Sequence, residues 1–417
     1  MYVDFYTILT LLVVLTAFFS YLNFRYIKLP LTIGIMILSL MTSLVIVIIG
    51  YFYPSFLHRS VEVIKSVDLE TMLMRIMLSF LLFAGAMHVN TSQLKKEMAP
   101  IIAFSTIGVL LSTALIGMAM YFILGWFNFH IPFIYCLLFG ALISPTDPIA
   151  VLGILKKAKI PSSLEIKITG ESLFNDGIGV VVFISLFEIA RMGVENLSIV
   201  QIGWVFLREA GGGILWGVIV GFAGFYLLRS IDNYQVEVMI TLAMVMGGYL
   251  FAFFLHISGP LAMVVAGIIT GNQGMQEAMS DKTRDYLAKF WEMIDEILNA
   301  LLFILIGFEM LIISMNHGLM WVSLIAIPVI LLARWISVLI PIFFLSFRRT
   351  FEKNTIAVLT WGGLRGGISV ALALSLPAGM HREEFLAITY VVVIFSIIVQ
   401  GLTIGKLARN LIKPANK

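Results

Sequence analysis

The chain has little charge and almost no cysteine. Only 12% of its 417 residues are charged and 60% are hydrophobic, whereas soluble proteins average about 25% and 45–50%. No water-soluble core of this length needs so much apolar surface, so the composition indicates an integral membrane protein. The single cysteine, Cys136, excludes an intramolecular disulfide and any multi-cysteine metal site. The six histidines are scattered without metal-ligand spacing.

Apolar runs of about 20 residues, the length that crosses a bilayer, recur along the whole chain. The runs are continuous rather than alternating, so we expect helices and not barrel strands. This predicts an all-α polytopic membrane protein that forms one transmembrane domain over residues 1–417, with no soluble regulatory domain. The thirteen expected helices cover residues 4–24, 30–53, 69–88, 98–126, 131–155, 168–190, 204–228, 236–256, 259–271, 290–315, 319–346, 354–377 and 385–407.

The distribution of lysine and arginine predicts an orientation. If the N-terminus is outside, most of the 27 basic residues fall in cytoplasmic loops or the C-terminal tail, and the outer loops hold only Arg59, Lys65, Arg191 and Arg382. Cytoplasmic loops of membrane proteins carry an excess of basic residues. We therefore expect a cell (inner) membrane protein with its N-terminus outside and its C-terminus in the cytoplasm.

Two expected helices contain sequences that interrupt a helix. In the fifth, Ser144-Pro145-Thr146-Asp147-Pro148 holds two prolines, each of which removes an amide donor and clashes with the preceding turn. In the twelfth, Arg365 is flanked by Gly362, Gly363, Gly366 and Gly367. Two broken helices of opposite direction, crossing near the midplane, are typical of inverted-repeat secondary transporters. The alternative is a simple kink in one helix and close helix packing in the other.

The sixth expected helix carries two carboxylates. Ser172 and Asp176 share one side at i,i+4 spacing, and Glu171 and Asn175 share the next. Glu171 and Asp176 lie roughly 140° apart around the helix, so they are not a proton-sharing dyad. The Ser172 side offers oxygens that suit a hard cation such as Na⁺. On the other side, Arg365 is the best partner for Glu171.

Asp176 is then the acid that is free to gain and lose a proton. Burial favours the neutral form of a carboxyl group. One carboxylate that holds either a proton or a cation supplies the coupling for exchange. The alternative is that Asp176 is itself salt-bridged or capped. Asp147 is expected to offset the partly positive end of a half-helix at the crossing.

At these residues the chain resembles the monovalent cation:proton antiporter type 1 family, the bacterial NhaP-like Na⁺/H⁺ antiporters related to animal Na⁺/H⁺ exchangers. The resemblance extends over nearly the whole chain. The motifs that carry it are Ser144-Pro145-Thr146-Asp147-Pro148, Gly170 through Asp176, Gly362-Gly363-Leu364-Arg365-Gly366, Leu81 through Gly85, and Asn299 through Glu309.

The resemblance implies an NhaA-like antiporter fold, a homodimer, and no cofactor. It implies a dimerisation scaffold of helices 1–3 and 7–10 and a mobile core of helices 4–6 and 11–13. It implies that Asp176, preceded by Asn175, is the carboxylate for Na⁺ and H⁺. Ser172 and the backbone of Thr146 are implied as further ligands. It also implies that Glu171 pairs with Arg365 and that Asp147 lies at the crossing.

An Asn-Asp pair in this family implies electroneutral one-for-one exchange. Some members have an acid in the third helix where this chain has Ala84, so a ligand there is not expected. The choice among Na⁺, Li⁺ and K⁺ stays open at this point. A cation channel and an intramembrane aspartyl protease are the competing functions, but no filter-like loop and no protease aspartate motif is present.

Other acids lie in the tenth expected helix. Glu292, Asp295 and Glu296 share a face, either as the mouth of a cation funnel or as an interfacial face paired with Lys282, Arg284 or Lys289. Glu309 lies deeper in the same helix, and Arg334 is its expected partner. We expect both residues of that pair to be structural.

Overall fold

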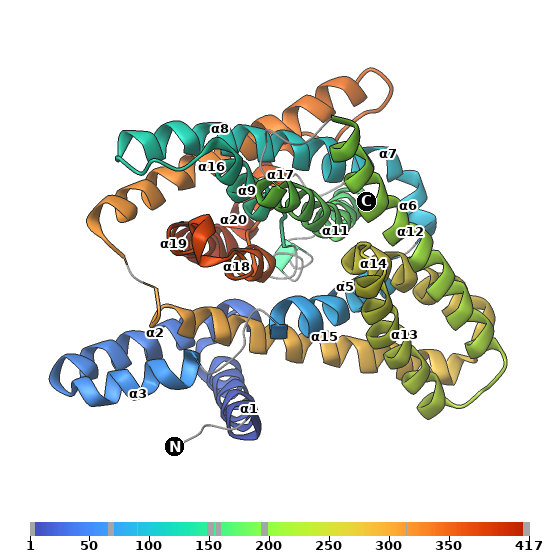
Figure 1. Ribbon diagram of the computed structural model, residues 1–417. Helices are drawn as coiled ribbons and strands as arrows, with labels where there is room; N and C mark the ends of the chain where they lie inside the picture. The colour runs from blue at the N-terminus through green and yellow to red at the C-terminus, as the bar shows by residue number, and fades with distance from the viewer. Residues whose placement is uncertain are drawn as a thin grey trace.

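The computed structural model describes residues 5–65, 71–89, 91–147, 154–155, 160–192, 199–313 and 315–411. Regular structure in these residues is helical, apart from one isolated β-bridge (Figure 1). Eight of the described helical segments are long and apolar enough to cross a membrane. They are Tyr6–Ile27, Leu31–Phe52, Leu94–Trp126, Ser162–Met192, Gly203–Arg229, Tyr234–Phe254, His317–Leu345 and Arg382–Leu411. The prediction of an all-helical, multi-pass membrane protein is confirmed.

The helices follow one another from the N-terminal to the C-terminal end of the chain. They are α1 (Phe5–Leu22), α2 (Leu31–Phe52), α3 (Pro54–Lys65), α5 (Leu78–Met87), α6 (Thr91–Lys96), α7 (Met98–Ala103), α8 (Val109–Trp126), α9 (Phe133–Ile143), α11 (Ser162–Met192), α12 (Ile199–Arg229), α13 (Tyr234–Phe254), α14 (Gly259–Ile269), α15 (Asp281–Glu309), α16 (His317–Leu345), α17 (Thr355–Gly362), α18 (Gly367–Leu374), α19 (Arg382–Phe395) and α20 (Gly401–Leu411). Wider π-helical turns continue several of them, including Met72–Met77 before α5 and Ser396–Gln400 between α19 and α20.

Helical residues occur in every range expected from the sequence, but several ends differ. α11 begins at Ser162 rather than 168, and α15 begins at Asp281 rather than 290. The expected ranges followed apolar runs, whereas these first turns are polar. The α15 start is fixed by Ser280, whose side chain accepts a hydrogen bond from the Thr283 amide. The short polar helix α3 was not expected for the same reason.

The helices pack in two groups (Figure 1). In the first group, α2 packs on α15, α5 on α14, and α14 on α12 and α13. In the second group, α8 packs on α9 and α16, α11 on α9, and α19 on α16 and α18. Small residues allow the closest contacts: a side chain at Gly140 of α9 would overlap the Thr113 carbonyl of α8.

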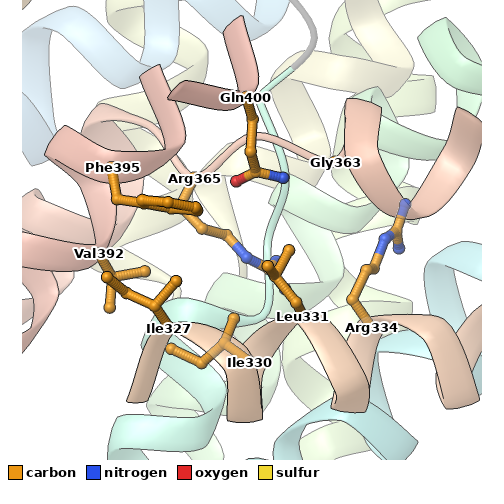
Figure 2. Close-up of a pocket in the computed structure, with 9 residues that line it drawn as sticks. All are labelled: Ile327, Ile330, Leu331, Arg334, Gly363, Arg365, Val392, Phe395 and Gln400. Atoms are coloured by element: carbon orange, nitrogen blue, oxygen red, sulfur yellow. The ribbon is translucent and has the colours of Figure 1, made fainter. Parts of the chain in front are cut away.

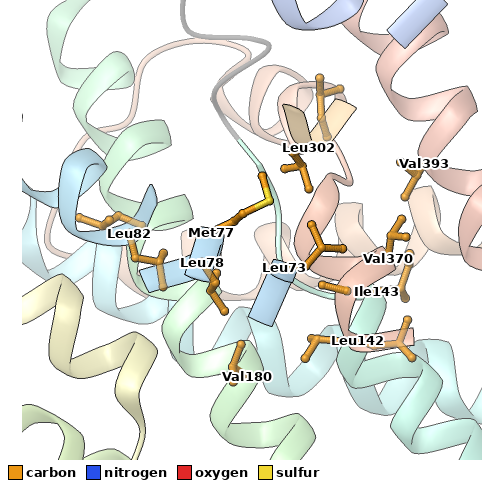
Figure 3. Packing of buried hydrophobic residues seen from close by; sticks show 14 of the residues in the cluster. Leu73, Met77, Leu78, Leu82, Leu142, Ile143, Val180, Leu302, Val370 and Val393 are labelled. Carbon is orange, nitrogen blue, oxygen red and sulfur yellow. The ribbon is translucent and has the colours of Figure 1, made fainter. Parts of the chain in front are cut away.

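Apolar side chains from both groups meet in one cluster (Figure 3). The first group contributes Leu78 and Leu82 of α5 and Leu302 of α15. The second group contributes residues of α9, α11, α18 and α19, which are Leu142, Ile143, Val180, Val370 and Val393. The residues named here are at most 5% exposed, so the two groups are closely packed where they meet.

Two helix breaks cross inside the second group. α9 ends at Ile143, and residues Ser144–Thr146 are not helical. α17 ends at Gly362 and α18 begins at Gly367. The crossing is a single antiparallel bridge, in which the Asp147 amide donates to the Leu364 carbonyl at 2.8 Å. Pro148, the second proline of the predicted break, lies outside the described residues.

Candidate ion-binding site

One face of α11 is bonded to the first break through Thr146. The Ser172 hydroxyl donates to the Thr146 carbonyl. The Asn175 side chain makes two bonds: its Oδ1 accepts from the Thr146 amide at 3.3 Å, and its Nδ2 donates to Thr146 Oγ1 at 2.7 Å. All three residues are buried. Thr146 lies in the non-helical break, so its backbone groups have no helical hydrogen-bond partners, and side chains of α11 bond to them instead.

Asp176 lies on the Ser172 side of α11 and is 8% exposed. Within the part of the chain that the structure describes, no hydrogen bond or ion pair to its carboxylate is found. The charges that act on it are those of Asp147 and Glu171, which are also acidic. The alternative of a salt-bridged Asp176 therefore has no partner among these residues. The Asp176 carboxylate lies one helical turn from Ser172, whose hydroxyl bonds to the Thr146 carbonyl. Carboxylate, hydroxyl and carbonyl are three oxygen groups of the kind that a hard cation prefers.

The close approach of the first break to α11 depends on a glycine. A Cβ at Gly179 would overlap the ring of Pro145. The spacing between Asp176 and the break is therefore set by a position that carries no side chain.

Arg365 joins the two breaks. Its guanidinium Nη1 donates to the Ser144 carbonyl and, at 2.9 Å, to the Pro145 carbonyl. Its own backbone amide donates to Ser396 Oγ at 2.8 Å. Arg365 is 2% exposed, so a charge from the second break stabilises the free carbonyls of the first.

Glu171 pairs with Arg334 of α16, at 2.5 Å between Oε1 and Nη1. Arg334 also donates from Nη2 to the Leu359 carbonyl at 3.3 Å. A Cβ at Gly363 would lie 2.8 Å from Arg334 Nε, so the glycine of the break lets this arginine pass to α11. The prediction that Glu171 pairs with Arg365 is corrected accordingly: Glu171 pairs with Arg334, and Arg365 Nη1 donates to the carbonyls of the first break.

Asp147 lies beside the start of α18. A side chain at Gly366, the residue that precedes α18, would overlap the Asp147 carboxylate. An acid near a helix N-terminus offsets its partial positive charge. The sequence predicts that Asp147 lies at the positive end of a half-helix at the crossing, and in the structure that half-helix is α18.

Two of the basic residues expected to pair with Glu292, Asp295 or Glu296 pair instead with other acids of α15. Arg284 pairs with Asp281 at 3.2 Å, and Lys289 with Asp285 at 2.6 Å. Asp295 accepts a 3.1 Å bond from Asn299 and is close enough to Asp147 for the two charges to repel each other.

Glu309 is 3% exposed, and one of its oxygens has no hydrogen-bond partner. The expected pair with Arg334 is corrected as well, since Arg334 bonds to Glu171.

Two cavities of about 10 Å³ each flank the Arg334 guanidinium, about the room that one water occupies. The first is lined by Thr146, Ile168, Glu171, Ser172, Arg334, Leu359, Gly362 and Gly363. The second is shown in Figure 2, with Arg334, Arg365 and Gln400 as its polar side chains. Among the residues described, no group of three or more His, Cys, Asp or Glu is suited to a resident metal.

The structure bonds Ser172 and Asn175 of α11 to Thr146 of the first break, and Asp176 follows one helical turn after Ser172. That these four residues bind an ion stays a prediction. Sequence reasoning did not predict the bonds that Arg334, Ser396 and Gln400 make. The only signal for Arg334 was its charge inside an apolar run, and Ser396 and Gln400 carried no signal.

Residues 13–410 match the family described as "Sodium/hydrogen exchanger, transmembrane". The Na(+)/H(+) antiporter NhaP of Pseudomonas aeruginosa is 48% identical over 408 residues, which are 96% of this chain and 95% of that protein. Human sodium/hydrogen exchanger 4 is 28% identical over 80% of this chain and 43% of its own length. The structure of the sodium proton antiporter MjNhaP1 from Methanocaldococcus jannaschii shares the fold, with a TM-score of 0.75, 21% identity and 97% coverage of both chains. The chain therefore belongs to the sodium/hydrogen exchanger family and is a transporter, not an enzyme.

Proposed function

We propose that this protein exchanges Na⁺ for H⁺ across a cell membrane and that both ions bind at Asp176. The observation that carries the proposal is the buried carboxylate of Asp176, which has no partner among the described residues, beside the bonded pair of Ser172 and Thr146. Na⁺ would take the Asp176 carboxylate, the Ser172 hydroxyl and the Thr146 carbonyl as ligands. A proton on Asp176 removes the charge that holds Na⁺, so binding of one ion excludes the other.

The charges around the site support one-for-one, electroneutral exchange. Glu171 is neutralised by Arg334, and Asn175 is neutral and bonded to Thr146. Asp147 lies beside the start of α18, where we propose that it stays ionised throughout, so that Asp176 is the site acid that changes charge during turnover. Each cycle carries one positive charge in each direction, either Na⁺ or H⁺.

Alternating access would come from movement of one helix group against the other. We assign α1, α2, α5 and α12–α15 to a scaffold through which two copies of the chain associate, and α8, α9, α11 and α16–α20 to a mobile core. This division is supported by the way the helices pack. With the N-terminus outside, Val180 lies one turn beyond Asp176 toward the outer surface. The apolar cluster of Figure 3, which includes Val180, would then seal the site from outside.

The direct test uses purified protein in acid-loaded liposomes with a pH-sensitive dye. Added Na⁺ should dissipate the pH gradient for the wild type and for Glu188→Gln, a matched acid further along α11. Asp176→Asn should give no Na⁺-driven proton movement while remaining folded. Robust exchange by Asp176→Asn would contradict the assignment of the site.

The same assay separates the remaining alternatives. Li⁺ and K⁺ added in place of Na⁺ identify the preferred cation, so a response to K⁺ with none to Na⁺ would make the protein a K⁺/H⁺ antiporter. A cation channel would carry Na⁺ without counter-movement of protons. Proton movement that requires Na⁺ supports the exchanger.

A further inference from the structure

The last helical segment changes geometry where it faces the second break. Between α19 and α20, residues Ser396–Gln400 form a π-helical turn. Such turns appear mostly as single insertions in α-helices and are frequent at functional sites. Ser396 and Gln400 are the polar ends of this turn, and they are 0% and 3% exposed. Polar side chains buried this deeply need partners.

Their partners are the two flanks of the second break. The Arg365 amide donates to Ser396 Oγ at 2.8 Å, and the Ser396 hydroxyl donates to Gln400 Oε1 at 2.8 Å. Gln400 Nε2 donates to the Trp361 carbonyl at 3.0 Å. The orientation of the Gln400 amide is fixed by this last bond, because a carbonyl accepts hydrogen bonds and cannot donate them.

The network satisfies backbone groups that the break leaves without helical partners. Trp361 precedes the non-helical residues 363–366, and Arg365 lies within them. Figure 2 shows the Gln400 amide, Arg365 and Gly363 around one cavity. The two side chains of this turn, Ser396 and Gln400, therefore tie the end of α17 to the interior of the break.

Arg365 connects this network to the ion site. Its backbone is held by Ser396, while its guanidinium holds the carbonyls of Ser144 and Pro145. The residue after Pro145 is Thr146, whose carbonyl accepts from Ser172. A continuous set of bonds thus runs from Gln400 to a proposed Na⁺ ligand.

We propose that Gln400 and Ser396 are positioning residues for ion exchange. They hold the second break to the last helix, so that Arg365 keeps the first break in the form that presents Thr146 to the ion. The inference rests on the proposed function and assigns to it two residues that do not themselves touch the ion.

The first experiment compares Gln400→Leu with Thr403→Val in the liposome assay. Thr403 is a matched control on the same helical segment, because its Oγ1 accepts a 2.9 Å bond from the indole of the same Trp361 and not from the break. Gln400→Leu should raise the Na⁺ half-saturation constant by about tenfold, the scale expected for a buried polar group left unpaired. Thr403→Val should leave it at the wild-type value. Equal constants for the two variants would overturn the proposal.

The second experiment uses Gln400→Glu at several pH values. A protonated glutamic acid can donate one bond and accept another, as Gln400 does here, whereas an ionised one only accepts. The ratio of variant to wild-type exchange should therefore approach one at acid pH and fall as the pH rises. The same ratio for Gln400→Leu should stay constant with pH. A loss of packing alone would give a constant ratio for both variants and would contradict the proposal.

Ser396→Ala keeps the test decisive if Gln400→Leu does not fold. It deletes one oxygen and breaks the network at its centre, so the Na⁺ half-saturation constant should again rise relative to Thr403→Val. An unchanged constant in folded Ser396→Ala protein would overturn the inference. Failure of the proposed function has a different signature, since the wild type itself would then show no Na⁺-driven proton movement.

Discussion

Arg334 of α16 and Glu171 of α11 form a buried ion pair, with 2.5 Å between Nη1 and Oε1. The pair passes Gly363, so it links α11, which carries the proposed ion site, to the second break. Both side chains are at most 6% exposed. Their mutual neutralisation leaves Asp176 as the acid that changes charge in the proposed cycle.

Removing one partner should destabilise the protein strongly, because the other charge is left buried at a cost of about 3–5 kcal/mol. Glu171→Gln and Arg334→Gln should each lower the melting temperature in detergent, and the double variant should recover part of the loss. All variants are compared in the same lipid and salt, since bound ions shift melting temperatures. Strictly additive losses would show that the two residues do not interact. The control is the double variant Glu171→Gln with Arg365→Gln, for which we expect a smaller recovery of the melting temperature.

Ser172→Ala should weaken Na⁺ binding while leaving the titratable acid in place. The change removes a proposed ligand and the donor to the Thr146 carbonyl, so the Na⁺ half-saturation constant should rise by about tenfold. Ser185→Ala is the matched control: Ser185 is also buried in α11, and its hydroxyl bonds within its own helix to Val181. Half-saturation constants that agree between the two variants would remove Ser172 from the ligand set.

Glu352, in the loop between α16 and α17, should stabilise the fold at neutral pH and not in acid. Lys167 lies 3.1 Å from its carboxylate. Burial raises the pKa of Glu352, but hydrogen bonds from Ser163, from its own backbone and from Lys167 lower that pKa below its ordinary value of 4.5. A lowered pKa in the folded state means that the stabilisation is present above 4.5 and is lost as the pH falls through the folded value.

The melting temperature of Glu352→Gln should accordingly lie below that of the wild type at pH 7, and the difference should shrink below pH 4.5. Glu277→Gln, a change at an exposed glutamate, should show no such pH dependence. A wild-type advantage that grows in acid would reverse the assigned sign.

The exchange rate should not depend on membrane potential. One positive charge moves in each direction per proposed cycle, so a potential of either sign does no net work on the cycle. The measurement sets potentials of opposite sign with a potassium gradient and valinomycin, and then follows Na⁺-driven proton movement. A rate that changes with the sign of the potential would rule out one-for-one exchange.

The sequence was most informative where a residue is unusual within its own segment. Asp176, Ser172 and Asn175 fall on adjoining faces of one helix, and the prolines and glycines mark the breaks locally. The partner of Glu171 was beyond this reasoning, because its choice depends on how α16 crosses α17. Two buried arginines were available, and only the fold shows that the carbonyls of Ser144 and Pro145 occupy Arg365.

The polar start of α11 shows the same limit. Lys167 is charged, and the apolar run in the sequence therefore begins after it. In the structure Lys167 is 2% exposed, inside a helix that begins at Ser162. Its burial depends on Glu97 and Glu352, which are far away in sequence. The Gln400 bonds also join distant segments, so no spacing in the sequence predicts them.

The central claim is that Na⁺ and H⁺ compete for one carboxylate, and the most direct test is the Na⁺ half-saturation constant of the wild-type protein measured across pH. If both ions bind at Asp176, each unit of pH below the pKa of that group should raise the constant about tenfold, because one proton must leave before Na⁺ binds. A constant that stays flat over about two acid pH units, where tenfold steps are expected, would contradict a shared site.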